Sequence, residues 1–140
     1  MAGRAPRRVS RTSRLPKREL NLPNLDEIVA INRSVRHADE WFADPDELDR
    51  IKSILQELRS EVDPIAAAAI ATSRIARTQA FTEGNKRTAL LVGRWILDRN
   101  GQKGDLIIPK YDLELANLLL KAARGSDVGP QIDALFKSRR

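Results

Sequence analysis

A run of small apolar residues in the middle of the chain limits the fold most strongly. The segment from Ile65 to Ala76 contains alanines at 66–69 and again at Ala71. Alanine has the highest helix propensity and a very small side chain, so this run predicts a helix that close neighbours surround. Asp63-Pro64 supplies an N-cap and a proline at the first helical position. The segment therefore predicts a central helix packed on other helices.

Helix-start signals also precede this run. Asn24 and Glu27 have the spacing of a capping box. Residues 44–47 read Asp-Pro-Asp-Glu, which offers an N-cap, a first-position proline and an acidic first turn. Apolar residues then recur at helical spacing: Leu48, Ile51, Ile54, Leu55 and Leu58.

The second half of the chain continues the helical pattern. A helix is predicted from about Lys86 to Arg99, ending at Asn100-Gly101. Two more are predicted, roughly over Leu113–Arg124 and after Gly129-Pro130. The one candidate strand is short, around Leu106–Ile108. We therefore expect an all-α, compact bundle of about six helices.

The net charge of +6 is concentrated at the N-terminus. Residues 1–20 hold seven of the 25 basic residues and one of the 19 acidic ones, which leaves 18 of each in residues 21–140. We predict a disordered basic tail over 1–20 and one domain over 21–140. Contact with nucleic acid or an acidic partner is expected only through the tail. A solubilising leader is the interpretation we favour for it.

Composition excludes several other classes of protein. The chain has no cysteine, which excludes disulfides and thiolate metal sites, and its single histidine argues against a His-based metal site. No apolar stretch approaches the roughly 20 residues that span a bilayer, and the tail lacks the apolar core of a secretory signal. We expect a soluble, cytoplasmic protein with no membrane partner.

The loop before the fourth predicted helix has the residues best suited to bind a ligand. It reads Phe81-Thr82-Glu83-Gly84-Asn85-Lys86-Arg87. Asn85 is suited to cap the helix, and Gly84 allows a ligand to approach the backbone closely. A helix N-terminus favours phosphate. Lys86 and Arg87 oppose the helix dipole there, which is easier to explain if an anion lies between them.

Each of these residues also has a purely structural interpretation. Glu83 and Arg87 have the i, i+4 spacing of a helical ion pair, which contributes roughly 0.3–0.5 kcal/mol. Gly84 could be only a turn residue, and Asn85 only a cap. A Walker-type phosphate loop is excluded, because Asn85 separates Gly84 from Lys86 and the loop follows a helix.

The loop resembles the signature of the Fic/Doc (Fido) family, His-x-Phe-x-Asp/Glu-Gly/Ala-Asn-Gly/Lys-Arg. Phe81 and the five residues 83–87 match it in register, whereas Gln79 replaces the family's histidine. The resemblance implies a helical Fic fold with a short flap segment before the second helix. By position that flap would be 36–43, with Trp41 and Phe42.

The resemblance implies a role for each matching residue. Glu83 would hold Mg²⁺, a cation that prefers carboxylate and phosphate oxygens. Gly84, Asn85 and Lys86 would bind the phosphates of ATP. Arg87 would also bind phosphate and would stabilise charge on the transferring group.

Two positions favour the Doc-like branch and phosphoryl transfer. AMP-transferring members usually have glycine and a second arginine where this chain has Lys86 and Leu90. The resemblance therefore implies a toxin-type transferase that moves the terminal phosphate of ATP to a Ser, Thr or Tyr hydroxyl of a protein, with an antitoxin as a possible partner. Protein AMP transfer is the alternative.

Gln79 decides whether such an enzyme turns over. A carboxamide can orient the attacking hydroxyl but is too weakly basic to accept its proton, and loss of a general base typically costs 10²–10⁴-fold. Activity is therefore expected to be weak. His37, the single histidine of the chain, is a weaker candidate for this base. A catalytically silent nucleotide-binding or interaction module is the second alternative.

Overall fold

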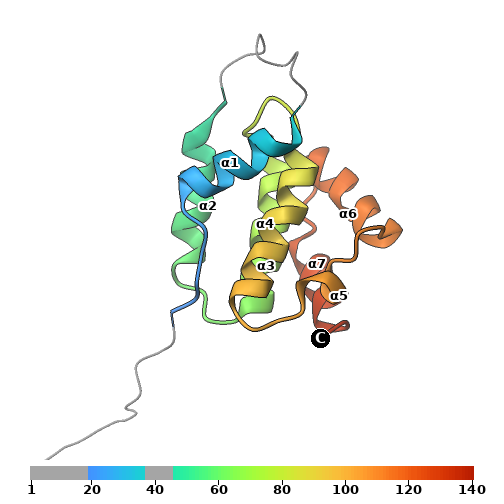
Figure 1. Cartoon of the computed structure of the whole chain (residues 1–140). Helices are drawn as coiled ribbons and strands as arrows, with labels where there is room; N and C mark the ends of the chain where they lie inside the picture. The colour runs from blue at the N-terminus through green and yellow to red at the C-terminus, as the bar shows by residue number, and fades with distance from the viewer. Residues whose placement is uncertain (1–18, 37–45) are drawn as a thin grey trace, which may run out of the picture.

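The structure is a computed structural model that describes residues 19–36 and 46–140, and all regular structure in these ranges is helical. The prediction of an all-α fold is confirmed. Figure 1 shows the seven helices of the described residues. They are α1 (Leu25–Val35), α2 (Leu48–Leu58), α3 (Pro64–Thr78), α4 (Asn85–Arg99), α5 (Gly104–Ile107), α6 (Leu113–Ala123) and α7 (Gly129–Lys137).

Helices α3 and α4 form the centre of the bundle (Figure 1). Their shared surface is the most extensive between any two helices, and α3 also packs on α2, α6 and α7, while α1 packs on α4. The two helices approach so closely that a Cβ on Gly93 would lie 2.4 Å from Thr72 Oγ1 and 2.8 Å from Ile108 Cδ1. The prediction that α3 is buried against close neighbours is confirmed, because its alanines 67–69, 71 and 76 are buried.

Three predicted helix starts are confirmed. Asn24 and Glu27 make both hydrogen bonds of a capping box, at 2.8 and 2.9 Å. Asp63 caps α3, its Oδ1 accepting from the Ile65 amide at 2.9 Å. Helix α7 begins at Gly129-Pro130.

The predicted strand at Leu106–Ile108 is wrong. Residues 104–107 form α5, and the Asp98 carboxylate accepts a hydrogen bond from the Gly104 amide at 2.9 Å just before it. Ile107 and Ile108 are buried in the core. A short apolar run has too few residues to show a period of 2 or 3.6, so a single helical turn can bury it equally well.

The start predicted for the second helix lies too early. Asp44 and Pro45 lie outside the described residues, and α2 begins at Leu48 with no side-chain cap bond from Glu47. Asp46 lies before the helix, and its carboxylate binds Arg36 and the Thr82 amide. The tail boundary at residue 20 stays a prediction, because residues 1–18 are also outside the described ranges.

None of the helices in residues 19–36 and 46–140 combines the length and the apolar character needed to cross a bilayer.

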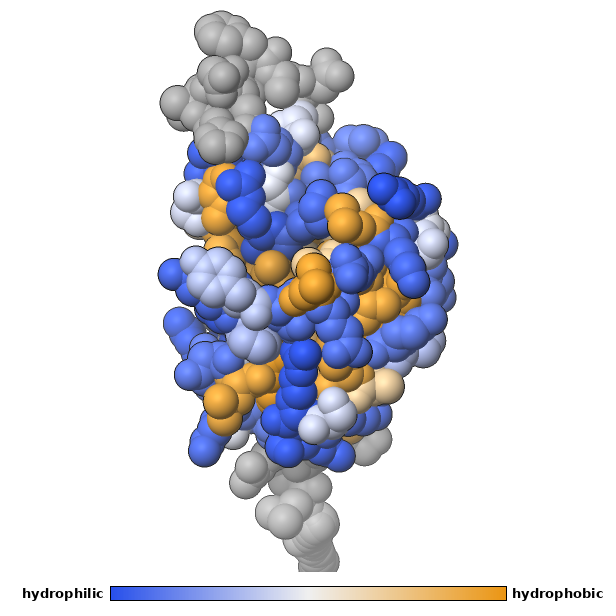
Figure 2. Space-filling view, turned by 90° about the vertical axis from the view of Figure 1, so that its right-hand side faces the viewer, coloured by the Kyte–Doolittle hydropathy of each residue, from blue (hydrophilic) through white to orange (hydrophobic). Residues whose placement is uncertain are grey.

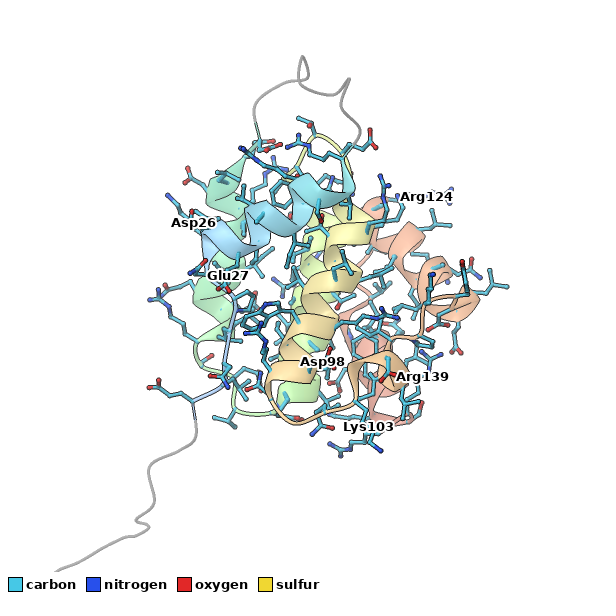
Figure 3. All side chains as sticks on the ribbon, viewed as in Figure 1. Asp26, Glu27, Asp98, Lys103, Arg124 and Arg139 are labelled. Atoms are coloured by element: carbon cyan, nitrogen blue, oxygen red, sulfur yellow. The ribbon has the colours of Figure 1, made fainter. Side chains whose placement is uncertain are left out.

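An ion pair ties the end of α7 to the start of α6. Asp112 caps α6 by accepting from the Leu115 amide at 3.2 Å, and its carboxylate also binds the Arg139 guanidinium. Arg139, labelled beside α5 in Figure 3, donates to the Ile107 carbonyl at 3.1 Å as well. The Arg139 hydrogen bond, with help from the Leu115 amide, lowers the pKa of Asp112 below its ordinary 3.8, against the opposing effect of burial.

We expect Asp112→Asn to lower the free energy of unfolding by about 1–2 kcal/mol at pH 7, through loss of a charged hydrogen bond. The folded-state pKa lies below 3.8, so this contribution is present above pH 3.8 and is lost as the pH falls below it. Urea unfolding of both proteins between pH 7 and pH 3 measures the difference.

The matched control is Asp49→Asn, whose side chain is 97% exposed, with an expected change within about 0.5 kcal/mol. A difference for Asp112→Asn that stays constant down to pH 3 would contradict this role of the carboxylate.

Candidate active-site loop

Residues 79–84 connect α3 to α4 and begin and end in a left-handed backbone conformation. Gln79 has φ 52° and ψ 42°, and Gly84 has φ 78° and ψ 15°. Glycine adopts this conformation freely, whereas other L-residues pay roughly 1–2 kcal/mol. Gln79 is the one non-glycine residue with positive φ among the described residues. Strain of this kind concentrates at functional sites.

Gly84 is also required by its surroundings. A Cβ at this position would lie 3.1 Å from Val35 Cγ2 and 3.2 Å from Asn32 Nδ2. Both neighbours belong to α1, so the loop lies directly against that helix. Gly84 is therefore more than a simple turn residue, because both its conformation and its crowding against α1 disfavour a side chain.

Asn85 does not cap α4, which corrects the prediction. Gly84 is at the N-cap position, and Asn85 is the first residue of the helix with only 6% of its surface exposed. Its Oδ1 accepts from the Phe81 amide at 3.1 Å, and its Nδ2 donates to the Phe81 carbonyl at 2.8 Å. Asn85 thus closes the loop from inside, over the buried ring of Phe81.

A buried asparagine on α1 supports the loop from below. Asn32 is fully buried, and its Nδ2 donates to the Glu83 carbonyl at 2.9 Å and to Thr88 Oγ1 at 3.1 Å. These bonds fix the main chain that bears the Glu83 carboxylate. Sequence reasoning missed Asn32, because one polar residue on a helix gives no sign of a partner 51 positions away.

A second clamp joins the loop to residues on either side of 37–45. Arg36 donates to both carboxylate oxygens of Asp46 at 2.9 Å and also binds the Thr82 hydroxyl. Asp46 accepts from the Thr82 amide at 3.1 Å. The Glu47 amide donates to the Ala80 carbonyl at 2.7 Å. The residues on both sides of 37–45 are therefore anchored on the loop, whereas residues 37–43 of the predicted flap, with His37, lie outside the described ranges.

The charged side chains of the signature lie at the surface, whereas the contacts that hold the loop backbone are buried or partly buried. Glu83 Oε1 and Arg87 Nη2 form the i, i+4 ion pair at 3.1 Å, and both side chains are partly exposed, by 39% and 49%. Lys86 is exposed, and the first turn of α4 has no acidic residue. The structure therefore places Glu83, Lys86 and Arg87 together at the N-terminus of α4.

Gln79 folds back on its own helix. Its Nε2 donates to the Ala76 carbonyl at 2.6 Å, and its Oε1 accepts from Asn85 Nδ2 at 3.5 Å. The first contact satisfies a carbonyl at the end of α3. The second, at the limit of hydrogen-bond distance, leaves the carbonyl oxygen of Gln79 only weakly engaged.

The residues present fit Mg²⁺ but do not form a metal site by themselves. No group of three or more His, Cys, Asp or Glu side chains that could hold a metal exists in the part of the chain that the structure describes. Mg²⁺ is usually bound through one or two carboxylates together with substrate phosphates. Glu83 beside the α4 N-terminus matches that donor set.

We expect Gly84→Ala to destabilise the protein more than Gly101→Ala does. Both glycines have positive φ, 78° and 81°, but a Cβ at Gly101 would meet nothing within 4 Å. The control should therefore cost only the backbone strain, about 1 kcal/mol. Gly84→Ala should cost about 1–3 kcal/mol more through crowding against α1. Chemical denaturation measures both, and equal losses would show that the loop does not depend on this contact.

Comparison with known proteins agrees with this geometry. Searches of curated proteins and of solved structures found no significant match. A model of the Fic/DOC family matches residues 9–97, which is more than half of the chain and includes α1 to α3, the whole loop and α4 up to residue 97. This family suggests a Fic-type transferase in general. The chain belongs to the Fic/DOC family.

Proposed function

We propose that the chain is a Doc-like transferase that binds Mg·ATP at residues 83–87 and transfers the terminal phosphoryl group to a Ser, Thr or Tyr hydroxyl of a protein. One observation supports this most strongly. The backbone of the loop is fixed by buried contacts, whereas Glu83, Lys86 and Arg87 remain accessible at a helix N-terminus. A preorganised backbone with exposed charges of this kind suits a polyphosphate.

The phosphate-binding roles divide between main chain and side chains. The Asn85 side chain is occupied by Phe81, so Asn85 would contribute its backbone amide at the start of α4. Gly84, which has no side chain, would allow the phosphates to approach its backbone closely. The exposed Lys86 ammonium would neutralise phosphate charge.

Glu83 would hold Mg²⁺, with Asn32 fixing its main chain from below. The bound ion would neutralise charge on the phosphates of the nucleotide. Glu83 would then exchange its contact with Arg87 for the ion. The guanidinium of Arg87, with five donors, would in turn bind the transferring group.

The proposed transfer can proceed without a protein base. The acceptor oxygen bonds to the γ-phosphorus, the bond to the bridging oxygen breaks, and ADP leaves. Gln79 Oε1 would accept a hydrogen bond from the acceptor hydroxyl and orient it. The hydroxyl proton then passes to solvent. Phosphoryl transfer depends mainly on positioning and electrostatics, so slow turnover is compatible with the missing histidine.

Protein AMP transfer and a catalytically silent module are the two alternative functions. Protein AMP transfer uses the same loop, but Lys86 and Leu90 replace the residues typical of that branch. A silent nucleotide-binding or interaction module is favoured by one observation: Gln79 is no proton acceptor and already donates to Ala76 at 2.6 Å. An antitoxin partner and a cytoplasmic location stay predictions.

Labelled ATP distinguishes these functions. The protein is incubated with Mg²⁺, a bacterial lysate and ATP labelled at either the α or the γ phosphate. We expect slow protein labelling from γ alone. Labelling from α instead would establish AMP transfer. Binding of ATP by calorimetry without labelling from either position would establish the silent module.

Gln79→His should raise γ-labelling by 10²-fold or more, because it supplies the missing base. Gln131→His, which places a histidine at an exposed position on α7, is the matched control and should change nothing. ATP affinity should be similar in all three proteins. Unchanged labelling in Gln79→His, with ATP still bound, would show that the deficit lies outside position 79.

A further inference from the structure

The outward face of α6 is apolar. The helix packs on α3 and α7 and buries Leu115, Leu119 and Ala122. Leu113 and Leu120 lie seven residues apart and therefore on one face, and they are 78% and 43% exposed.

Exposed apolar side chains are concentrated around this helix. Six large ones are exposed among the described residues, and four of these lie between 106 and 120: Leu106, Tyr111, Leu113 and Leu120. Figure 2 views the side on which α6 lies in Figure 1, and apolar side chains reach the surface there between hydrophilic ones. Contiguous exposed apolar surface often marks a protein interface, and Leu113 and Leu120 share one face of α6.

The charges beside the two leucines limit what can cover them. Glu114 and Lys121 are exposed and also lie seven residues apart, on one edge of the apolar stripe. A partner of a single charge would attract one of them and repel the other. A helix that carries the opposite charges in reversed order would attract both. An antiparallel second copy of α6 is such a helix.

We propose that this face binds a second copy of the chain through an antiparallel, two-fold symmetric α6–α6 contact. In this arrangement Glu114 faces Lys121 of the other copy, and the symmetry produces the pair twice. A parallel two-fold arrangement would instead place the charged edges of the two copies on opposite sides of the contact, where neither pair forms.

The remaining exposed residues of α6 fit the same contact. Asn117 lies between the two leucines and near the two-fold axis, where its amide can both donate and accept. Exposed Ala116 and half-buried Ala123 lie on the edge opposite the charges, and their small side chains allow close approach of the helices. The inference does not depend on phosphoryl transfer, since no signature residue takes part.

Sedimentation velocity of the full chain tests the proposal. Two short helices form a small interface, so we scan concentrations from about 10 μM to about 1 mM. The mass should rise from 15.7 kDa toward twice that value as the concentration increases. A monomer at every concentration would overturn the proposal.

Leu120→Lys should weaken association at least tenfold, because it puts a charge in the apolar stripe. Val62→Lys is the matched control, since Val62 is 57% exposed but precedes α3, away from α6. An equal effect of the two substitutions would place the interface elsewhere and overturn the proposal. Circular dichroism checks that each variant keeps its helices.

A charge exchange tests the antiparallel orientation. Glu114→Lys and Lys121→Glu should each weaken self-association, since every pair then unites like charges. Mixing the two variants should restore association to the wild-type level, because each copy supplies what the other lacks. Misfolded variants would not recover on mixing. A mixture that remains as weak as its components would overturn the antiparallel contact.

Discussion

The close approach of α3 and α4 is the constraint on which the rest of the structure depends. A Cβ at Gly93 of α4 would clash with Thr72 of α3, and most alanines of α3 are buried. The short loop must therefore reverse the chain within a narrow distance. Left-handed conformations at Gln79 and Gly84 provide that reversal. The position of the signature at the start of α4 thus follows from helix packing.

In the loop, the groups that hold the backbone differ from the charged side chains that could contact a ligand. The groups that fix its backbone are buried: Asn32 binds the Glu83 carbonyl, and Asn85 binds Phe81. The groups that could meet a nucleotide, Lys86 and Arg87, are exposed. A charged side chain can exchange one partner for another at little cost near solvent, whereas a buried amide cannot. This division allows the charges to rearrange around a ligand while the backbone stays in place.

The sequence predicted the helices because their signals are local. Asn24 with Glu27 and Asp63 with Pro64 act within one turn, so spacing alone identifies them. The i, i+4 spacing also predicted the pair of Glu83 and Arg87 correctly, although Glu83 lies in the loop just before α4.

Contacts between distant segments were missed. Asp46 was expected in the acidic first turn of α2 but instead binds Arg36 and Thr82, and only the fold brings these residues together. Asn85 differs from the prediction for another reason, since its partner Phe81 is only four residues away, and a helix cap and a loop closure have the same local sequence. The apolar run at Leu106–Ile108 was too short to show its period.

Gln79, at the position where the family signature has histidine, is structurally independent of the half of the loop that we propose to bind phosphate. Gln79 makes its firmest contact with Ala76 in α3, and its contact with Asn85 is long at 3.5 Å. Asn85 and Gly84 are fixed mainly by other partners. Loss of the base therefore removes no bond on which the helix N-terminus depends. If the proposed function holds, a chain of this fold would lose rapid proton transfer and keep a loop shaped for phosphate, so nucleotide binding and turnover would be separate properties.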